Sequence, residues 1–335
     1  MRREIVYSLT LLGALAAGGV AVNAQEFDSN IKVPGITALT AHTGVPQGFD
    51  PVSASDSQLE VYGFPRRPDM NDTKAYTRWV QAVSGTRIVP QFTNSGRRHL
   101  PNQRIGKSET VANTTNSSSG NWSGYSVQKS SNPPFVQVDG LWIVPSVNNQ
   151  SQSINGYMSE WVGIDGNCTC NDLIQDGTEQ QFTNGQATYY AWIEFIPENE
   201  VVVNNFPVAP GDVITAYSWV TSSGGVVKGN YYLYNANTKL SVSTSLTIPP
   251  NTSFSGKSVE WIVERTEVGG SFTNPLPYYA FSYMDNAFAF LNGSTHAYTY
   301  TNFANENITM VQGSTKLSKA YEQDSDSMWF QWENY

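Results

Sequence analysis

The sequence predicts an all-β protein, and three observations lead to this prediction. Residue types that favour strands are abundant, and Phe, Trp and Tyr together make up 13% of the 335 residues. Gly, Pro, Asn and Asp interrupt the apolar segments at short intervals, which is the spacing expected of a β-sandwich. Beyond residue 121, no segment has a helical period over three turns.

Successive segments after residue 120 have the residue pattern of strands. In order along the chain they are NWSGYSVQ, VQVDGLWIVP, SEWVGIDG, NDLIQDGTEQ, ATYYAWIEFIP, PGDVITAYSWV, NYYLYNA, LSVSTSLTIP and SVEWIVERT. The last third of the chain adds PLPYYAFSYMDNAFAFLNG, HAYTYTNF, ITMVQG and SMWFQWENY. Each of these segments is a candidate strand of the sandwich.

The segment GKSVEWIVER, residues 256–265, raises a question about chemistry. As a strand it places Glu260, Ile262 and Glu264 on one face and three apolar residues on the other. Strands are usually depleted in Glu, so two carboxylates on one face need a reason. This face is either solvated or part of a catalytic cleft.

The first 24 residues have the pattern of a secretory signal peptide. Arg2 and Arg3 form a basic start, a largely apolar stretch follows over 6–22, and VNA, ending at Ala24, resembles a cleavage site. The alternative is a membrane anchor, for which this stretch is short. We therefore expect cleavage after Ala24 and a secreted, extracellular protein. No other segment has the roughly 18 apolar residues of a membrane span, so no membrane association is expected.

The rest of the chain divides by charge. Residues 25–120 hold ten Lys and Arg against eight Asp and Glu, whereas residues 121–335 hold seven against nineteen, so the net charges are +2 and −12. A basic segment is attracted to an acidic domain near neutral pH, and protonation of carboxylates in acid weakens that attraction. We interpret 25–120 as a propeptide that inhibits its own domain; the alternative is a linker or small accessory domain. The Ser/Asn/Gly run at Asn113–Gly120 is expected to be the exposed segment where the chain is cut.

Cysteine and histidine are too few for several kinds of site. Cys168 and Cys170 are the only cysteines, which excludes a disulfide-rich scaffold and argues against a zinc site. Of the histidines, His42 and His99 lie in the propeptide region, and only His296 remains for a Ser-His-Asp triad. No phosphate-binding or dinucleotide motif is present, and the acidity argues against nucleic acid. We expect no metal, no cofactor and no nucleic-acid partner.

Carboxylate chemistry remains. Candidates lie beside aromatic residues in the predicted strands: Glu260, Glu264, Glu194, Glu160 and Asp165. Two carboxylates on a sheet would suit a glycosidase. One carboxylate together with an amide donor would suit hydrolysis of an amide bond by water. The residue types leave both classes open.

Six segments resemble those of a known protein family, and they appear in the family's order and approximate spacing. They are NWSGY, WVGIDG, LIQDG, YYAWIEFIP, APGDVITAY and VEWIVE. With these segments, residues 121–335 resemble the glutamic peptidases, or eqolisins, which are secreted acid endopeptidases. The resemblance implies a concanavalin-like antiparallel sandwich of two large sheets, with the active site on a concave face and a propeptide before it.

The resemblance also implies a catalytic pair. The family's Gln lies fourteen residues after the Trp of WVGIDG, which leads from Trp161 to Gln175. The family's Glu is assigned here to the first one of EWIVE, Glu260, with Glu264 as a neighbour on the same face. Glu260 would act as general base on the attacking water, and the Gln175 amide would donate a hydrogen bond to the oxyanion.

Further positions resemble the family's cleft, and two positions depart from it. The expected substrate-binding residues are Trp122, Trp161, Asp165, Glu179 and Glu194. The family's disulfide to a Cys before the EWIVE strand is in doubt, because no Cys lies there and the CTC segment has two. Glu160 replaces an uncharged residue beside Trp161, so altered substrate pockets are expected.

The first hypothesis is therefore a secreted acid endopeptidase made as a zymogen, with protein or peptide substrates, its own propeptide as inhibitor, and a monomeric state. The second is a lectin-like or glycoside hydrolase sandwich that acts on polysaccharide, with Glu194 and Glu260 as paired carboxylates. A third is a binding sandwich without catalysis. The presence of both Gln175 and Glu260 disfavours the third, because a binding protein needs neither.

Overall fold

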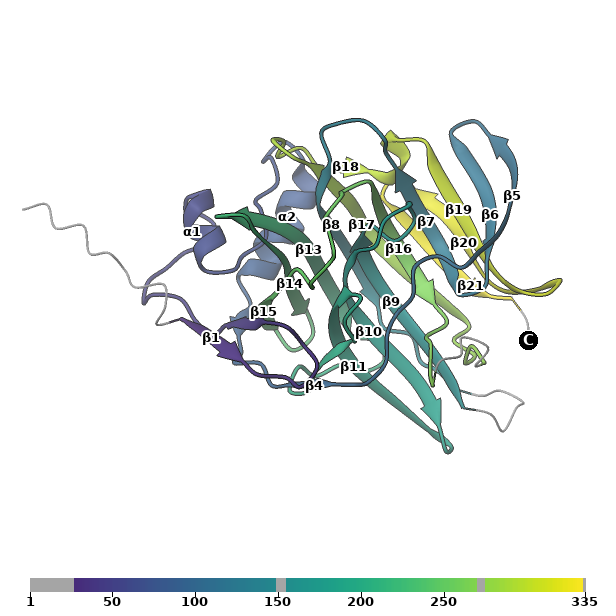
Figure 1. Ribbon diagram of the computed structural model, residues 1–335, viewed down its shortest axis with the longest axis horizontal. Coiled ribbons are helices and arrows are strands. Elements are labelled where there is room, and N and C mark those ends of the chain that lie inside the picture. Colours follow the sequence, from purple (N-terminus) through teal and green to yellow (C-terminus); the bar gives the residue numbers. More distant parts are fainter. Residues whose placement is uncertain (1–26, 149–154, 270–274, 334–335) are drawn as a thin grey trace, which may run out of the picture.

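The computed structural model describes residues 27–148, 155–269 and 275–333. In these ranges the chain forms an antiparallel β-sandwich with two short α-helices at its N-terminal end, which confirms the all-β prediction (Figure 1). The expected signal peptide, residues 1–24, lies outside them. None of the helices in the described ranges is long and apolar enough to cross a membrane.

The first layer of the sandwich carries most of the predicted site residues. Its strands follow one another across the sheet and are antiparallel to their neighbours: β12 (Val201–Val203), β11 (Gln186–Ile196), β10 (Leu173–Thr183), β9 (Gly156–Ile164), β16 (Ser258–Glu264), β7 (Trp122–Gln128) and β19 (Asn305–Gln312).

The second layer continues from the first without a break. Its strands are β20 (Thr315–Asp324), β21 (Ser327–Trp332), β17 (Phe281–Leu291), β8 (Phe135–Ile143), β13 (Val213–Ser223), β14 (Val226–Asn235) and β15 (Leu240–Thr247). Strand β18 (Tyr298–Thr299) and the 3-10 helix η2 (Tyr300–Asn302) lie beside β17. Because β19 pairs with β20, one continuous hydrogen-bonded sheet folds back on itself into two layers.

The core between the layers is made by the alternating apolar positions of both sheets. Strand β16 directs the fully buried Trp261 into it, and its indole Nε1 donates to the backbone oxygen of Asp139 on β8, at 2.8 Å. The indole Nε1 of Trp142 on β8 donates to the side-chain hydroxyl of Thr178 on β10, at 2.9 Å. These two indoles thus add apolar area to the core and satisfy their polar atoms across the layers.

Residues 27–120 form an ordered extension of the sandwich, which we call the leader. Its elements are β1 (Asp28–Ile31), β2 (Leu39–His42), α1 (Asp56–Val61), α2 (Thr73–Val83), β3 (Thr86–Arg87), β4 (Phe92–Asn94), β5 (Arg104–Val111) and β6 (Thr114–Ser119). Strand β2 pairs with β15, β4 with β12, and β6 in parallel with β19, so the leader lengthens both layers.

The two leader helices were not predicted from the sequence. In α2 the buried residues Ala75, Trp79, Ala82 and Val83 recur at helical spacing on one face. That face packs against β14 and β17 of the second layer. Trp79 is fully buried and its Nε1 donates to the oxygen of Pro65. The helix therefore owes its stability to tertiary packing more than to its eleven-residue length.

The expectation that Asn113–Gly120 is an exposed segment is wrong. Residues Thr114–Ser119 form β6, which pairs with β5 on one side and β19 on the other, and Ser117 and Ser119 are buried. Small polar residues suggested a loop, but backbone hydrogen bonds to two neighbouring strands hold the segment in the sheet. The exposed part lies just before β6: residues 110–113 are exposed, and 112–113 form the turn between β5 and β6.

This arrangement predicts where an added protease cuts the end of the leader. Brief digestion at neutral pH with a protease of broad specificity should cleave the turn at 112–113 at least tenfold faster than residues 114–120, because cleavage needs a locally exposed backbone. Mass spectrometry of the fragments measures the ratio. Preferred cleavage inside 114–120 would contradict the pairing of β6.

Glu160 points into the core and away from Trp161, because neighbouring residues of a strand face opposite sides. Its carboxyl is fully buried and accepts a hydrogen bond from Ser282 of β17. Burial raises the pKa of Glu160 to about 8. The expectation that this residue alters a substrate pocket is therefore wrong, since it lies on the opposite face of β9.

Glu160 makes stability depend on pH. Its pKa rises from 4.5 to about 8 on folding, so the folded state is favoured below 4.5 and loses stability as pH rises toward 8. At about 1.4 kcal/mol per pH unit, the loss at pH 7 is on the order of 3 kcal/mol. Glu160→Gln should therefore raise the melting temperature by several degrees at pH 7 and by about one or two degrees at pH 5.

Circular dichroism melting curves at both pH values measure this difference. The control is Glu322→Gln, which removes a carboxylate from an exposed position of β20. An equal effect of Glu160→Gln at the two pH values would show that Glu160 does not bind its proton more tightly in the folded state.

Candidate active site

The register of four strands brings the predicted catalytic residues to one face of the first layer. Across β16, β9, β10 and β11, Glu260 lies opposite Gly163, Gly163 opposite Gln175, and Gln175 opposite Glu194. The two residues that carry the predicted mechanism are thus two strands apart, with a glycine between them.

A second row of polar residues lies four positions along the same strands. There Glu264 is opposite Ser159, Ser159 opposite Glu179, and Glu179 opposite Tyr190. Between the two rows lies an aromatic row that contains Trp161 and Trp192, both fully buried. The face therefore holds carboxylates at both ends of an apolar strip.

Gln175 is oriented by Glu194. Its amide Nε2 donates to Glu194 Oε2 at 2.6 Å, while its Oε1 is buried without a hydrogen-bond partner. Burial raises the pKa of Glu194 well above its usual range, with nearby glutamates adding to the effect and the proximity of His99 opposing it. One N–H of the Gln175 amide is used by Glu194, which leaves the second N–H for another acceptor.

Glu264 has the richest set of contacts in the second row. Its Oε2 accepts from the indole Nε1 of Trp161 at 2.9 Å, and its Oε1 accepts from the Asn121 amide at 3.3 Å and from the backbone N–H of Leu100 at 3.2 Å. The side chain is almost completely buried. These donors fix the carboxylate and compensate in part for the water it has lost.

Glu260 is held differently. Its Oε1 accepts from the Ser126 hydroxyl at 3.4 Å, and its Oε2 is buried without a hydrogen-bond partner. Burial, with the carboxylate of Asp165 nearby, raises its pKa well above the usual range, although the neighbouring polar groups of Ser258, Asn167 and Ser126 oppose this. A buried carboxyl in this state holds its proton in acid.

Trp122 and Glu179 complete the predicted cleft positions on this face. Trp122 packs edge to face against Trp161, with ring centres 4.9 Å apart. Glu179 accepts from the Thr266 hydroxyl at 2.8 Å, and its Oε1 lies 3.9 Å from the Arg97 guanidinium. Burial, with Glu200 nearby, raises the pKa of Glu179.

Asp165 contacts a loop instead of the rows described above. Its carboxylate accepts the backbone N–H groups of four successive residues, 255–258, at 2.7 to 3.3 Å. Asp165 itself has a φ of 66° at the turn that follows β9. The residue therefore fixes the chain that enters β16, which carries both Glu260 and Glu264.

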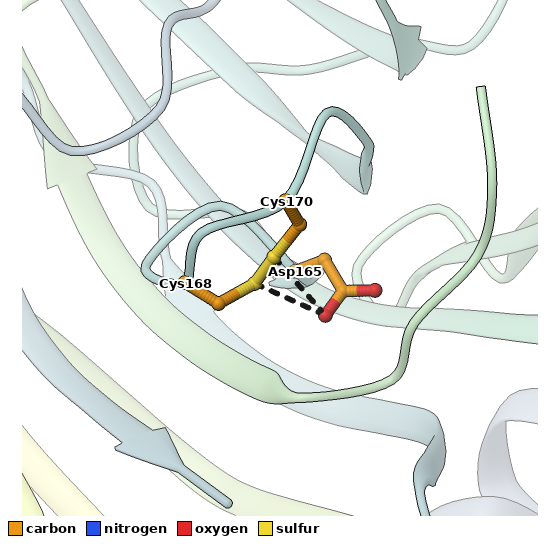
Figure 2. A group of neighbouring side chains, drawn as sticks. All are labelled: Asp165, Cys168 and Cys170. Carbon is orange, nitrogen blue, oxygen red and sulfur yellow. Dashed lines mark hydrogen bonds between the residues drawn. A yellow bond between two sulfur atoms is a disulfide. The ribbon is translucent and has the colours of Figure 1, made fainter. Parts of the chain in front are cut away.

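The two cysteines lie beside this aspartate. Figure 2 shows Cys168 and Cys170 joined to each other as a disulfide, with both sulfur atoms next to Asp165. The sulfurs are 3.4 and 3.8 Å from its Oδ1. The cysteines thus pair within the turn and make no link to the segment before β16.

The leader crosses this face between β4 and β5 (Figure 1). His99 is fully buried and stacks on Trp192, with ring centres 3.9 Å apart and planes 15° apart. Its Nε2 lies 2.9 Å from Glu200, its Nδ1 lies 3.2 Å from Glu264, and its backbone N–H donates to Glu194 at 3.2 Å. Burial alone would lower the pKa of His99, but hydrogen bonds to Glu200 and Glu264 outweigh it and raise the pKa well above the usual range.

Sequence reasoning missed the role of His99. It was assigned to the leader and therefore left out of the site, although 165 residues separate it from Glu264 in the chain and only 3.2 Å in space. The one available signal was the basic segment SGRRHLPNQR in an otherwise weakly charged region. Glu200 was also missed, because it lies in a short connection before β12.

His296 lies outside this site. Its Nδ1 is 2.9 Å from Asp72 of the leader, and its side chain is about half exposed. It bonds a residue at the start of α2 and contacts no residue of the two rows. Its contacts are those of a half-exposed, hydrogen-bonded residue at the boundary between leader and sandwich.

Two groups of possible metal ligands occur among the described residues. One is Asp165 with the two cysteines, whose sulfurs are already joined to each other. The other is His99 with Glu179 and Glu200, where the His99 Nε2 already pairs with Glu200. The leader histidine thus fills the second group with a charge-assisted hydrogen bond.

Comparisons with known proteins give a family match over the sandwich. The model of the Peptidase A4 family matches residues 120–332. Aspergillopepsin-2 of Aspergillus niger is 28% identical over 199 residues, which cover 53% of this chain and 68% of that protein. Scytalidopepsin B of Scytalidium lignicola is 29% identical over 151 residues, which cover 44% of this chain and 55% of that protein.

Solved structures share the fold. Scytalido-glutamic peptidase with a transition-state analogue inhibitor superposes with a TM-score of 0.54 at 21% identity, covering 64% of this chain and 98% of that one. SCP-B, described as a member of the eqolisin family in a complex with the tripeptide Ala-Ile-His, gives a TM-score of 0.51 at 21% identity and the same coverage. At this level of identity, the structural likeness concerns the fold.

Proposed function

This chain belongs to the Peptidase A4 family of glutamic-type peptidases, and from this premise we propose that it is a secreted acid endopeptidase made as a precursor that its own leader inhibits. The observation that carries the proposal is that the backbone of the leader lies in the site and is hydrogen-bonded to its carboxylates. Glu194 accepts the N–H of His99 and Glu264 accepts the N–H of Leu100, so two carboxylates contact consecutive backbone amides of the leader. Membership of a peptidase family favours this function over the polysaccharide alternative.

We propose Glu264 as the general base in place of Glu260, the assignment made from the sequence. Glu264 contacts the amide nitrogen of Leu100, which stands in for a substrate amide, and Trp161 and Asn121 hold its carboxylate in place. Glu260 has a raised pKa and hydrogen-bond partners outside the leader. A base must be unprotonated in acid and within reach of the reacting groups. The raised pKa of Glu260 counts against it on the first requirement, and the contact with Leu100 supports Glu264 on the second.

The reaction would proceed with water as the nucleophile. Glu264 would take a proton from the water as it attacks the carbonyl carbon, and would pass it to the leaving amine nitrogen. The amide of Gln175, oriented by Glu194, would donate its second N–H to the oxyanion. Removing a single donor of this kind typically costs on the order of 10²–10³ in rate.

Paired variants test this assignment. At about pH 4, near the intrinsic pKa of a glutamate, Glu264→Gln should lose at least about 10³-fold in hydrolysis of a denatured protein, because the base is gone. Gln175→Ala should lose about 10²–10³-fold in the same hydrolysis rate, because the oxyanion loses a hydrogen-bond donor. Glu260→Gln, the same change in the same strand, should stay within about tenfold of wild type.

Rates are followed by mass spectrometry of the substrate, and circular dichroism confirms that each variant is folded. An inactive Glu260→Gln beside an active Glu264→Gln would restore the assignment made from the sequence. Full activity of both glutamate variants would exclude a glutamate base in this strand.

The leader has the contacts of an intramolecular inhibitor. Besides His99, four of its cations pair with carboxylates of the sandwich: Lys74 with Asp285 and Asp326 at 2.6 and 2.7 Å, Arg78 with Asp285 at 3.8 Å, Arg104 with Glu306 at 2.8 Å, and Arg97 with Glu179 at 3.9 Å. These pairs agree with the opposite net charges of the two regions. Protonation of the acceptors in acid would weaken them.

His99 itself favours the inhibited state in mild acid. Because its pKa is raised, the stabilisation from its ion pairs is full below the unfolded value of about 6.5 and is lost as pH rises through the raised value. His99→Gln should therefore let the intact precursor digest substrate at pH 5.5 at least about tenfold faster than wild type.

The matched control is Arg98→Gln, which removes a charge from the adjacent, exposed position. It should behave as wild type. Initial rates are measured while mass spectrometry shows the precursor to be intact. A wild-type precursor as active as its trimmed product would contradict inhibition by the leader.

A further inference from the structure

Glu200 holds the leader through both backbone and side chain. Its backbone N–H donates to the oxygen of Arg97 at 3.0 Å, and its backbone oxygen accepts from the N–H of Ser95 at 3.2 Å. These two bonds are available to any extended peptide, whatever its sequence. The Glu200 carboxylate, by contrast, reaches the side chain two residues further on, His99, at 2.9 Å.

The position occupied by the His99 ring has the features of a pocket for a cation. Trp192 forms the floor of this pocket, with its ring centre 3.9 Å from that of His99. The face of an indole attracts a planar cation. Glu200 lies at the edge of the ring, fixed by the hydroxyl of Tyr190 on its other oxygen at 3.2 Å. Glu179 adds a buried oxygen that has no hydrogen-bond partner. Glu200 and Glu179 have side chains that are fully buried.

A neutral side chain at this position would leave the carboxylate of Glu200 buried without its partner. Sites built to pair with a polar group reject a ligand that lacks it more strongly than apolar pockets reject a missing methylene, because the buried group is left unsatisfied. The pocket is therefore selective for charge as well as for shape.

We propose that Glu200, above the ring of Trp192, is a specificity-determining residue that selects substrates with a basic side chain at the position held here by His99. The substrate class is peptides with histidine, arginine or lysine at that position. This inference rests on the proposed function, because it takes the leader to lie where a substrate lies.

The neighbouring positions of the leader agree with this. Arg97, two residues before His99, donates to Gln181 at 2.9 Å and to the Tyr190 hydroxyl at 3.2 Å, and its guanidinium lies 5.0 Å from the ring centre of Tyr157. Arg98 between them is exposed. Alternate side chains thus face the site, as in an extended peptide, and both of those that do so are basic.

The test compares the cleavage preferences of wild type, Glu200→Gln and Glu198→Gln. Each full-length chain is kept at about pH 4 until its leader is digested, and then digests a mixture of denatured proteins. Mass spectrometry of the products gives the frequency of each residue type at each position around the cleaved bonds. Glu198→Gln is the matched control, because Glu198 lies two residues away and accepts from Thr37 of the leader.

For wild type, one position should be enriched at least about fivefold in histidine, arginine and lysine over the substrate composition. Glu200→Gln should reduce this enrichment to less than about twofold, and Glu198→Gln should keep it. Wild-type digestion without such a position, or the same enrichment in Glu200→Gln, would overturn the inference while leaving the peptidase function intact. Absence of digestion by wild type would overturn the proposed function itself, and the inference with it.

Discussion

The pairing of β16 with β7 on one side and β9 on the other is the constraint on which the site depends. Its register decides that Glu260 and Glu264 face the leader side of the sheet while Trp261 enters the core. A shift by one residue would exchange the two faces and bury the glutamates in the sandwich. The four backbone N–H groups held by Asp165 lie at the start of this strand, so the turn carrying Asp165 contributes to its register.

The sequence allowed the sandwich and this face to be predicted because both follow from local alternation. The strand at 258–264 and its two faces are confirmed, and the likeness to a peptidase family is confirmed for 120–332. Which of two glutamates four residues apart contacts a peptide could not be read from alternation, because both point the same way. That distinction needs the neighbours from other strands, Trp161 for one and Ser126 for the other.

The leader was harder to predict. Its charge suggested attraction to the sandwich, and ion pairs such as Lys74 with Asp285 agree with that suggestion. Its helices and strands gave little signal, because short elements are stabilised by the surface on which they pack. The segment Thr114–Ser119 is polar throughout, yet it is a strand between two others. Composition describes side chains, whereas backbone hydrogen bonds decided the structure here.

Strand β6 has a consequence for how strongly the leader must bind. Because β6 is hydrogen-bonded to β19, the rest of the leader is tethered next to the site that it covers. A short tether of this kind corresponds to an effective local concentration in the millimolar range, so modest contacts keep the site occupied. Once the chain is cut in the turn at 112–113, the tether is gone and the same contacts compete with dilution in the surrounding solution. At micromolar or lower protein concentrations, one broken peptide bond would reduce occupancy by orders of magnitude without any change in the contacts themselves.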